Sequence, residues 1–205
     1  MKVTVAADCL QLLLNAAVSF TAVSTSAKTA LQSIRFERLG DHLAAVSTDQ
    51  YRMGVTRVPA QFDGGGDWQA TVIKHDLRPL RAALKTVGKK APVAFELSGD
   101  ELTVAVEGFS LEVPLADVEF PSWRKIMVGG DYSTGVPTQV SSYLLSTFRG
   151  AVRDSNDPAV VACSSSPTRP IRITVGDYFV GLAMPQKPTP EARADSRWLE
   201  EALKN

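Results

Sequence analysis

The cationic side chains that could jointly bind one ligand are found in residues 77–94, a stretch without an acidic residue. Its cations recur at spacings of three or four and are Arg78, Arg81, Lys85 and Lys89. On a helix this spacing places them on one face, opposite a stripe of leucines. Such a face could bind the phosphates of a nucleic acid. A solvated helix surface has the same pattern, so the spacing alone leaves both interpretations open.

A second candidate site is the compact polar turn Thr48-Asp49-Gln50-Tyr51-Arg52-Met53. It joins two stretches with the apolar alternation of β-strands, and apolar residues follow it directly. Binding residues are often found on loops that rigid elements hold in place. We therefore expect this turn to form the edge of a site.

The sequence contains no common catalytic or metal-binding motif, neither GxxxxGK, HExxH or GxSxG nor a Cys or His cluster. His42 and His75 lie far apart, without the spacing of metal ligands. The run at 64–66 is a linker rather than a phosphate cradle, because no helix start follows it. Cys9 and Cys163 are unclustered, as expected of reduced thiols in a core. We expect a protein that is not an enzyme and that needs no cofactor or metal.

Composition further limits the kinds of protein that this chain could be. A chain of 205 residues can form a core without disulfides or metals. Its 22 Lys and Arg balance its 22 Asp and Glu, so a nucleic acid would be contacted only through local segregation of charge. The start lacks the features of a signal peptide, and no apolar run approaches the roughly 18 residues of a membrane span. We expect a soluble, cytoplasmic protein.

One unit, a strand followed by a helix and three strands, recurs three times. In the first unit a strand at 3–6 precedes a helix that Asp8 would cap, with Gln11 as its capping-box partner. Three strands follow within 31–58, and a glycine-rich linker at 61–67 leads to the second unit.

The second unit has a strand at 68–73 and a helix that Asp76 would cap and Gly88 would end. The apolar face of this helix consists of Leu77, Leu80, Leu84 and Val87. Its three strands are expected at 93–97, 102–106 and 109–115.

The third unit has a strand at 136–140 and a helix that Ser141 or Ser142 would cap. Its three strands are expected at 159–163, 171–175 and 178–184. Residues 191–204 have the pattern of an amphipathic helix. That helix could dock on its own subunit, seal a subunit interface or cover a neighbouring groove.

These elements predict an α+β fold of antiparallel sheets with one helix per unit. We expect one domain at 1–127, built from units at 1–60 and 67–127. A half domain at 128–187 and a C-terminal tail at 188–205 follow.

Three separated segments resemble the sliding clamp, the DNA polymerase III beta subunit of bacteria and phages. In the first, Thr48, Asp49, Arg52 and Met53 match the family's Thr-Asp-Gly-His-Arg-Leu-Ala motif, whereas Gln50 and Tyr51 replace its Gly and His. The second segment, Phe120-Pro121-Ser122-Trp123-Arg124-Lys125-Ile126-Met127, is similar to the family's Phe-Pro-Asp-Tyr-Arg-Arg-Val-Leu-Pro linker. The third, Tyr178–Pro185, is similar to its C-terminus.

The resemblance covers about residues 1–187 and corresponds to a shortened clamp, the second domain with the C-terminal half of the third. It implies the DNA-clamp fold and a groove for partner peptides with apolar anchors. The residues carried over to the groove are Leu31, Thr48, Tyr51, Arg52, Met53, Ile126, Leu182, Met184 and Pro185. The alternative is that the apolar members are ordinary core residues.

The resemblance also implies that the helices line a hole for double-stranded DNA and contact phosphates without reading sequence. The cations on the second helix would then face DNA, joined by Arg149 and Arg153 on the third helix. The first helix has no cation on its polar face.

The function implied is that of a polymerase processivity factor, which encircles DNA and binds peptides of the polymerase and the clamp loader. A ring of about twelve units would need four chains of three units, so we expect a homo-oligomer, a tetramer if the ring closes. An alternative is an open module without a ring, which binds clamp-binding peptides as a regulator or competitor. A small-molecule binder on the same scaffold has no residues that favour it.

Overall fold

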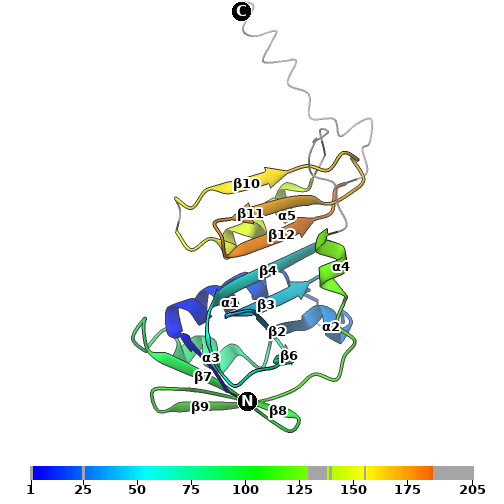
Figure 1. Ribbon diagram of the computed structural model, residues 1–205. Helices are drawn as coiled ribbons and strands as arrows, with labels where there is room; N and C mark the ends of the chain where they lie inside the picture. The colour runs from blue at the N-terminus through cyan, green and yellow to red at the C-terminus, as the bar shows by residue number, and fades with distance from the viewer. Residues whose placement is uncertain (1, 25, 129–137, 139, 155, 187–205) are drawn as a thin grey trace, which may run out of the picture.

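The computed structural model describes residues 2–24, 26–128, 138, 140–154 and 156–186 (Figure 1). In this part of the chain, strands form one sheet of seven strands and one of five, and every neighbouring pair is antiparallel. The predicted α+β class is therefore confirmed. No helix within these residues is long and apolar enough to cross a membrane.

The seven-stranded sheet combines strands from all three predicted units. In spatial order they are β10 (Ala159–Ala162), β11 (Ile171–Val175), β12 (Phe179–Ala183), β4 (Arg52–Pro59), β3 (His42–Thr48), β2 (Ser33–Leu39) and β6 (Gln69–Ile73). The third unit thus continues the sheet of the first, because β12 pairs with β4.

The five-stranded sheet combines the first and second units. Its strands are, in order, β5 (Gln61–Asp63), β1 (Lys2–Ala6), β7 (Pro92–Ser98), β8 (Glu101–Val106) and β9 (Phe109–Pro114). The stretch predicted as a linker at 61–67 therefore begins with a short strand, which covers the outer edge of β1.

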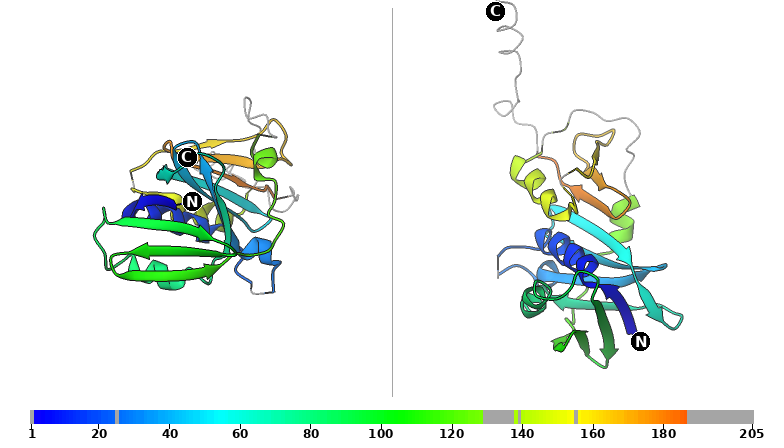
Figure 2. Two further views of the ribbon diagram at one scale, coloured as in Figure 1. Left: turned by 60° about the horizontal axis from the view of Figure 1, so that its bottom comes forward. Right: turned by 90° about the vertical axis from the view of Figure 1, so that its left-hand side faces the viewer.

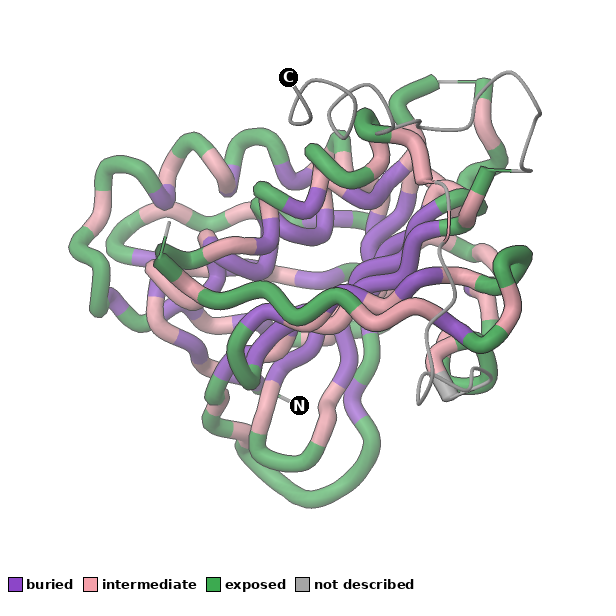
Figure 3. The backbone as a smooth tube through the Cα atoms, turned by 90° about the horizontal axis from the view of Figure 1, so that it is seen from above, coloured by how far each residue is buried: buried purple, intermediate pink, exposed green. Residues whose placement is uncertain are grey.

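The first two units exchange their leading strands. β1 leaves the first unit to pair with β7, and β6 leaves the second unit to pair with β2. The exchange gives both units one continuous buried core, which includes Val3, Phe36, Val72 and Phe95. Figure 3 shows this core as buried backbone along the central strands, with exposed turns around it.

The helices of the described part of the chain are α1 (Ala7–Ser19), α2 (Thr29–Gln32), α3 (Arg78–Ala83), α4 (Trp123–Val128), α5 (Ser142–Ser146) and the 3-10 helix η1 (Thr147–Ala151). Most of them lie together on one side of the molecule (Figure 2). In the right-hand view of Figure 2, α5 with η1, α1 and α3 follow one another along one side, with strands on the other. The two short helices α2 and α4 are the exceptions and lie near the ends of strands (Figure 1).

The predicted cap of the first helix is wrong. Asp8 lies inside the first turn of α1, whose N-cap is Ala6, and among the described residues its carboxylate accepts only from the neighbouring amide of Cys9 at 2.8 Å and from Lys90. The loop before β7 takes that role, because the amides of Ala7 and Asp8 donate to the carbonyls of Ala91 and Lys89, both at 2.9 Å. The Asp8 carboxylate instead pairs with Lys90 at 2.8 Å.

The second helix is shorter than predicted and Asp76 does not cap it. α3 begins at Arg78, with Pro79 in its first turn, where the missing amide proton of proline leaves no hydrogen bond unmade. It ends at Ala83, so that Lys85 and Lys89 lie beyond the helix.

Two predicted elements lie partly or wholly outside the described residues. Of the strand expected at 136–140, only Thr138 and Val140 are described, and neither is in a strand. The predicted helix at 191–204 lies wholly outside them. The third helix is confirmed, as α5 continued by η1, although the hydroxyl of Ser141 makes no capping bond.

A cluster of three phenylalanines fills the space beneath the junction of β4 and β12. The ring of Phe20 lies 4.9 Å from that of Phe148 and 5.5 Å from that of Phe179, measured between centroids. Gly54 and Gly181 face each other across the two strands. A Cβ atom at Gly181 would lie 2.6 Å from Phe148 and 2.7 Å from Phe179, so the rings occupy the space of the missing side chain.

We predict that Gly181→Ala destabilises the protein, because the added methyl group would displace aromatic rings in a packed core. Overpacking of this kind typically lowers the free energy of unfolding by about 1–3 kcal/mol. Urea denaturation measures the loss. Gly88→Ala is the control, since nothing lies within 4 Å of its Cβ position. Equal effects of the two substitutions would contradict the close packing at the junction.

Candidate functional site

An apolar groove of about 270 Å³ lies where the ends of β4 and β12 meet α2 and α4. The structure brings together in its lining eight of the predicted groove residues, namely Leu31, Thr48, Tyr51, Arg52, Met53, Ile126, Leu182 and Met184. Pro185, half-buried, follows Met184 and is not part of the lining.

Pairing between β4 and β12 forms the floor of the groove. Met53 lies opposite Leu182 in this pairing, and the amide of Met184 donates to the carbonyl of Tyr51 at 2.8 Å. Met53 and Leu182 are buried, with 4% and 3% of their surface exposed. On the rim, Tyr51, Ile126 and Met184 expose 63%, 45% and 38%. The groove thus has a buried apolar floor and an apolar rim that no described residue covers.

A buried carboxylate holds the α4 wall. Glu37 of β2 is 4% exposed and accepts hydrogen bonds from Arg124 at 2.6 Å and from the indole of Trp123 at 3.3 Å. Both donors lie in the first turn of α4, so these contacts place Ile126, one turn further along, at the groove.

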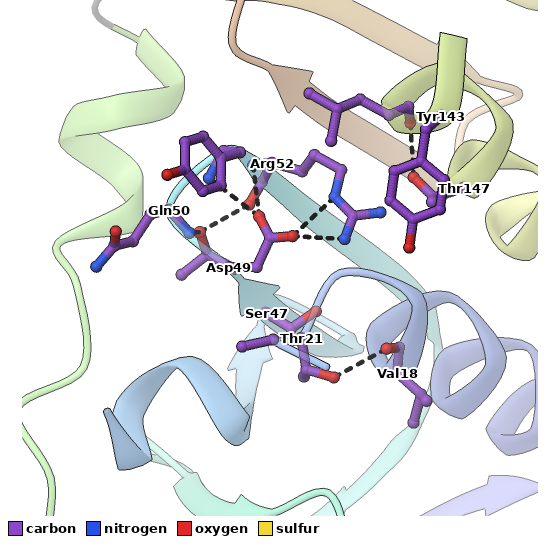
Figure 4. A network of polar contacts seen from close by, with 12 residues as sticks. Val18, Thr21, Ser47, Asp49, Gln50, Arg52, Tyr143 and Thr147 are labelled. Atoms are coloured by element: carbon purple, nitrogen blue, oxygen red, sulfur yellow. Dashed lines mark hydrogen bonds and ion pairs between the residues drawn. The ribbon is translucent and has the colours of Figure 1, made fainter. Parts of the chain in front are cut away.

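The polar turn owes its shape to Asp49. One carboxylate oxygen accepts from the amides of Tyr51 at 3.0 Å and Arg52 at 2.8 Å. The other accepts from the Arg52 guanidinium, with Nε at 2.9 Å and Nη2 at 2.5 Å (Figure 4). The hydroxyl of Thr48 closes the turn by donating to the Arg52 carbonyl at 2.7 Å.

Arg52 is a buried cation at the base of the turn. Its side chain is 3% exposed and lies 5.9 Å from the ring centres of both Phe20 and Tyr143. Its Nη1 atom is buried and has no hydrogen-bond partner among the described residues. The guanidinium therefore serves first to brace the turn and the sheet junction, and only part of it borders the groove.

Sequence reasoning missed three lining residues, Gln50, Pro121 and Pro170. Gln50 and Pro121 belong to the motifs that carried the resemblance, but nothing near Pro170 indicated a site. Gln50 has φ of +80°, a left-handed conformation that glycine adopts without strain. This explains why a glycine in the matching motif fits the turn. Leu31, predicted in a strand, lies in the short helix α2 before β2 begins at Ser33.

Three of the predicted cations lie together beside α1. Arg78, Arg81 and Lys85 line a hollow of about 240 Å³ with Gln11 and Asn15 of α1. Arg81 Nη2 donates to the side-chain oxygen of Asn15 at 3.4 Å. Although Lys85 lies past the end of α3, the turn that follows keeps it on the same side.

Lys89 and Arg153 lie elsewhere, at a hollow of about 370 Å³ by the start of α1. Lys90 and Asp8 line it too. Lys90 donates to the Asp8 carboxylate and holds the pKa of that carboxyl below its usual value. The two groups of cations thus flank α1. The carboxylate of Asp8 pairs with Lys90, which was not among the predicted cations.

On the third unit, Arg149 of η1 is exposed and lines neither hollow. Arg153 stacks over the ring of Tyr178, with its guanidinium 4.9 Å from the ring centre. The Tyr178 hydroxyl donates to Asp157 at 2.6 Å, and burial raises the pKa of the tyrosine. Among the described residues, no group of three or more His, Cys, Asp or Glu side chains could hold a metal ion.

Comparison with known proteins gives one matching family model. Residues 4–122 match the central domain of the DNA polymerase III beta subunit. No curated protein matches the sequence at a significant level.

Solved structures share the fold over 92% of this chain. A putative DNA polymerase III beta subunit from Eubacterium rectale superposes with a TM-score of 0.75 at 10% identity. The sliding clamp of Pseudomonas aeruginosa bound to griselimycin gives 0.75 at 16%, and the beta subunit of Thermotoga maritima 0.73 at 9%. The chain spans 66% of the length of each. The sliding-clamp fold predicted from the sequence is thereby confirmed.

We predict that Asp49→Ala destabilises the fold, because it leaves the buried Arg52 guanidinium without its counterion. Loss of one partner of a buried pair typically lowers the free energy of unfolding by about 3 kcal/mol. Chemical denaturation measures the change. Lys90→Ala, which removes an ion pair whose lysine side chain is 83% exposed, is the control and should have little effect. A small effect of Asp49→Ala would contradict the bracing role of Arg52.

Proposed function

Because the chain belongs to the DNA polymerase III beta subunit family, we propose that it acts as a sliding-clamp-like processivity factor, which encircles DNA and tethers a polymerase through a peptide groove. The observation that carries this proposal is the groove at the β4–β12 junction. Its floor and rim need residues from the first and third units together.

The groove suits a short peptide with apolar anchors. Its buried floor of Met53 and Leu182 offers a surface for Leu or Phe side chains, and its exposed rim of Tyr51, Ile126 and Met184 leaves apolar area in water until a ligand covers it. Few polar groups border it, so the anchors would supply most of the affinity. Peptide segments of a polymerase and of a clamp loader are the proposed ligands.

The row of helices suits double-stranded DNA. Four cations lie beside α1, with Arg78 and Lys85 at one hollow and Lys89 and Arg153 at the other. This is the side of the molecule on which α1, α3 and η1 are found (Figure 2). These side chains are exposed, as contacts to phosphates require. The chain has no net charge at neutral pH, so this local grouping would supply the attraction.

The sliding-clamp fold fits a role without catalysis, since tethering requires binding alone. The proposed clamp is a replication accessory protein that acts as a homo-oligomer, a tetramer if four chains of three units close a ring. It carries no cofactor, and a cytoplasmic location agrees with contact to DNA and polymerase.

A second candidate is an open module without a ring, which binds clamp-binding peptides as a regulator or competitor. The observation that favours it is that the groove is lined within one chain and shares no residue with the two basic hollows. Retention on DNA separates the two functions. A clamp should stay on a circular plasmid during gel filtration and leave it when the plasmid is cut once, whereas an open module should elute separately from both.

We predict that Ile126→Asp weakens the binding of a fluorescent peptide with Leu and Phe anchors by at least tenfold, because it places a charge on the apolar rim. Fluorescence anisotropy measures the affinity. Val23→Asp, at an apolar side chain that is 79% exposed and outside the groove, is the control. Unchanged binding by Ile126→Asp would refute the groove assignment under both candidate functions.

We predict that Arg78→Glu with Lys85→Glu weakens binding to a fluorescent DNA duplex and makes it less dependent on salt. For every phosphate that the variant no longer neutralises, the slope of log affinity against log salt should fall by about 0.9. The control is Lys2→Glu with Lys125→Glu, an equal change of charge at exposed lysines of β1 and α4. Equal weakening in the two double variants would show that only net charge matters and would contradict a DNA-facing helix row.

A further inference from the structure

The seven-stranded sheet is apolar on both of its faces where β4 pairs with β12. Side chains alternate along β4, and Gly54 faces the phenylalanine cluster, so Met53 and Val55 lie on the opposite face. Their partners on β12 are Leu182 and Val180. The face of an antiparallel sheet that is turned away from the core is usually polar. Two successive apolar pairs on this outer face therefore call for a cover or a ligand.

The helix α4 covers this outer face only in part. In the right-hand view of Figure 2, α4 (green) lies on the other side of the strands from α1. Ile126 of α4 lines the groove, whose floor is the first of the two apolar pairs. Trp123 and Met127 line a separate pocket of about 290 Å³, to which the second pair contributes. α4 thus lies between two apolar pockets on one strand ladder.

The separate pocket, an outer pocket beside α4, suits one apolar side chain. Its apolar lining is half-buried and consists of Leu39, Val55, Trp123, Met127 and Val180. Arg57 and Asp177 border it with one charge of each sign, and it shares no lining residue with the groove. A contact between α4 and the sheet that served stability alone would be closely packed, as protein interiors are. The open space instead fits a ligand side chain without charge.

The outward side of α4 is basic. Trp123, Ile126 and Met127 occupy the sides of the helix that border the two pockets, which leaves Arg124 and Lys125 on the rest of its circumference. The Arg124 side chain is 60% exposed, and Lys125 is exposed as well. A peptide that passes over α4 from one pocket to the other meets these cations. Acidic residues in that part of the peptide would complement them.

We propose that the outer pocket is a second anchor site for the peptide that binds in the groove. The ligand is a peptide with its first apolar anchors in the groove, an acidic linker over α4 and a further Leu or Phe side chain in the outer pocket. A helix is about 10–12 Å across, so the linker needs about five extended residues to pass over it. The inference rests on the proposed peptide groove and specifies what a longer partner peptide contacts beyond it.

Fluorescence anisotropy with three labelled, amidated peptides tests the proposal. The short peptide has Leu and Phe anchors alone, the extended peptide adds an acidic linker and a terminal Phe, and the third peptide ends in Ser instead. The wild-type protein should bind the extended peptide about tenfold more tightly than the Ser-ended one, because a further apolar side chain is buried. Val180→Asp should abolish this gain but leave the affinity for the short peptide unchanged, whereas Ile126→Asp should weaken all three.

The charge of α4 is tested separately. Lys125→Glu should weaken binding of both long peptides, because it places an acidic side chain beside their acidic linker. It should leave the short peptide unaffected, since Lys125 lines neither pocket. Equal weakening of all three peptides would contradict a linker that passes over α4.

A second variant and a second measurement guard against misfolding. Val55→Thr is close to the wild type in volume and should reduce the gain about twofold, because it adds a hydroxyl to the outer pocket. NMR of methionine methyl carbons needs no substitution at all. The short peptide should shift the signals of Met53 and Met184 in the groove, and the extended peptide should also shift that of Met127.

The outcomes separate this inference from the proposed function. If the wild-type protein binds the short peptide but gains nothing from the terminal Phe, the second anchor site is refuted and the groove remains. The same conclusion follows if the gain survives both valine substitutions and the Met127 signal stays in place, because the anchor then lies elsewhere. If none of the three peptides binds, the peptide groove and the second anchor site fail together.

Discussion

Pairing of β12 with β4 is the contact on which the rest of this molecule depends. It is the only strand pairing in the described part of the chain that joins the third unit to the first two. Gly54 and Gly181 let the two backbones meet above Phe20, which follows the end of α1, and above Phe148 of η1 and Phe179 of β12. Each aromatic contact of this kind contributes about 0.5–1.5 kcal/mol beyond the area that it buries. The third unit is held in place by a sheet ladder and an aromatic core together.

The groove is a consequence of this junction. Met53 lies near the start of β4 and Leu182 near the end of β12. No further strand residues cover these two side chains, so they lie close to the surface and line the groove. Asp49 and Arg52 shape the adjoining turn, and the Arg52 guanidinium lies above Phe20 of the aromatic cluster. A change that separates the third unit from the first would therefore remove the groove floor and loosen the turn at the same time.

Much of this arrangement could be predicted from sequence, because strands and turns follow local patterns. Apolar alternation located most of the strands, and the family resemblance predicted eight residues that line one groove, seven of them in the three matching segments and Leu31 outside them. The errors lie where contacts distant in sequence decide the structure. The start of α1 is capped by carbonyls of Lys89 and Ala91, which no pattern around Asp8 could reveal. Pro170 reaches the groove only because β11 lies beside β12. The exchange of β1 and β6 between units is likewise a property of topology.

The two candidate surfaces are arranged so that both could be occupied at once. The groove and the two basic hollows share no lining residue. α1 nevertheless connects them, since Gln11 and Asn15 line the hollows while Phe20, just beyond the end of the helix, lies under the turn of Arg52. Ser47 fixes that end by donating to the carbonyl of Ala17 at 2.7 Å. In the proposed clamp, this helix would hold a peptide in the groove at a fixed position relative to DNA beside the hollows.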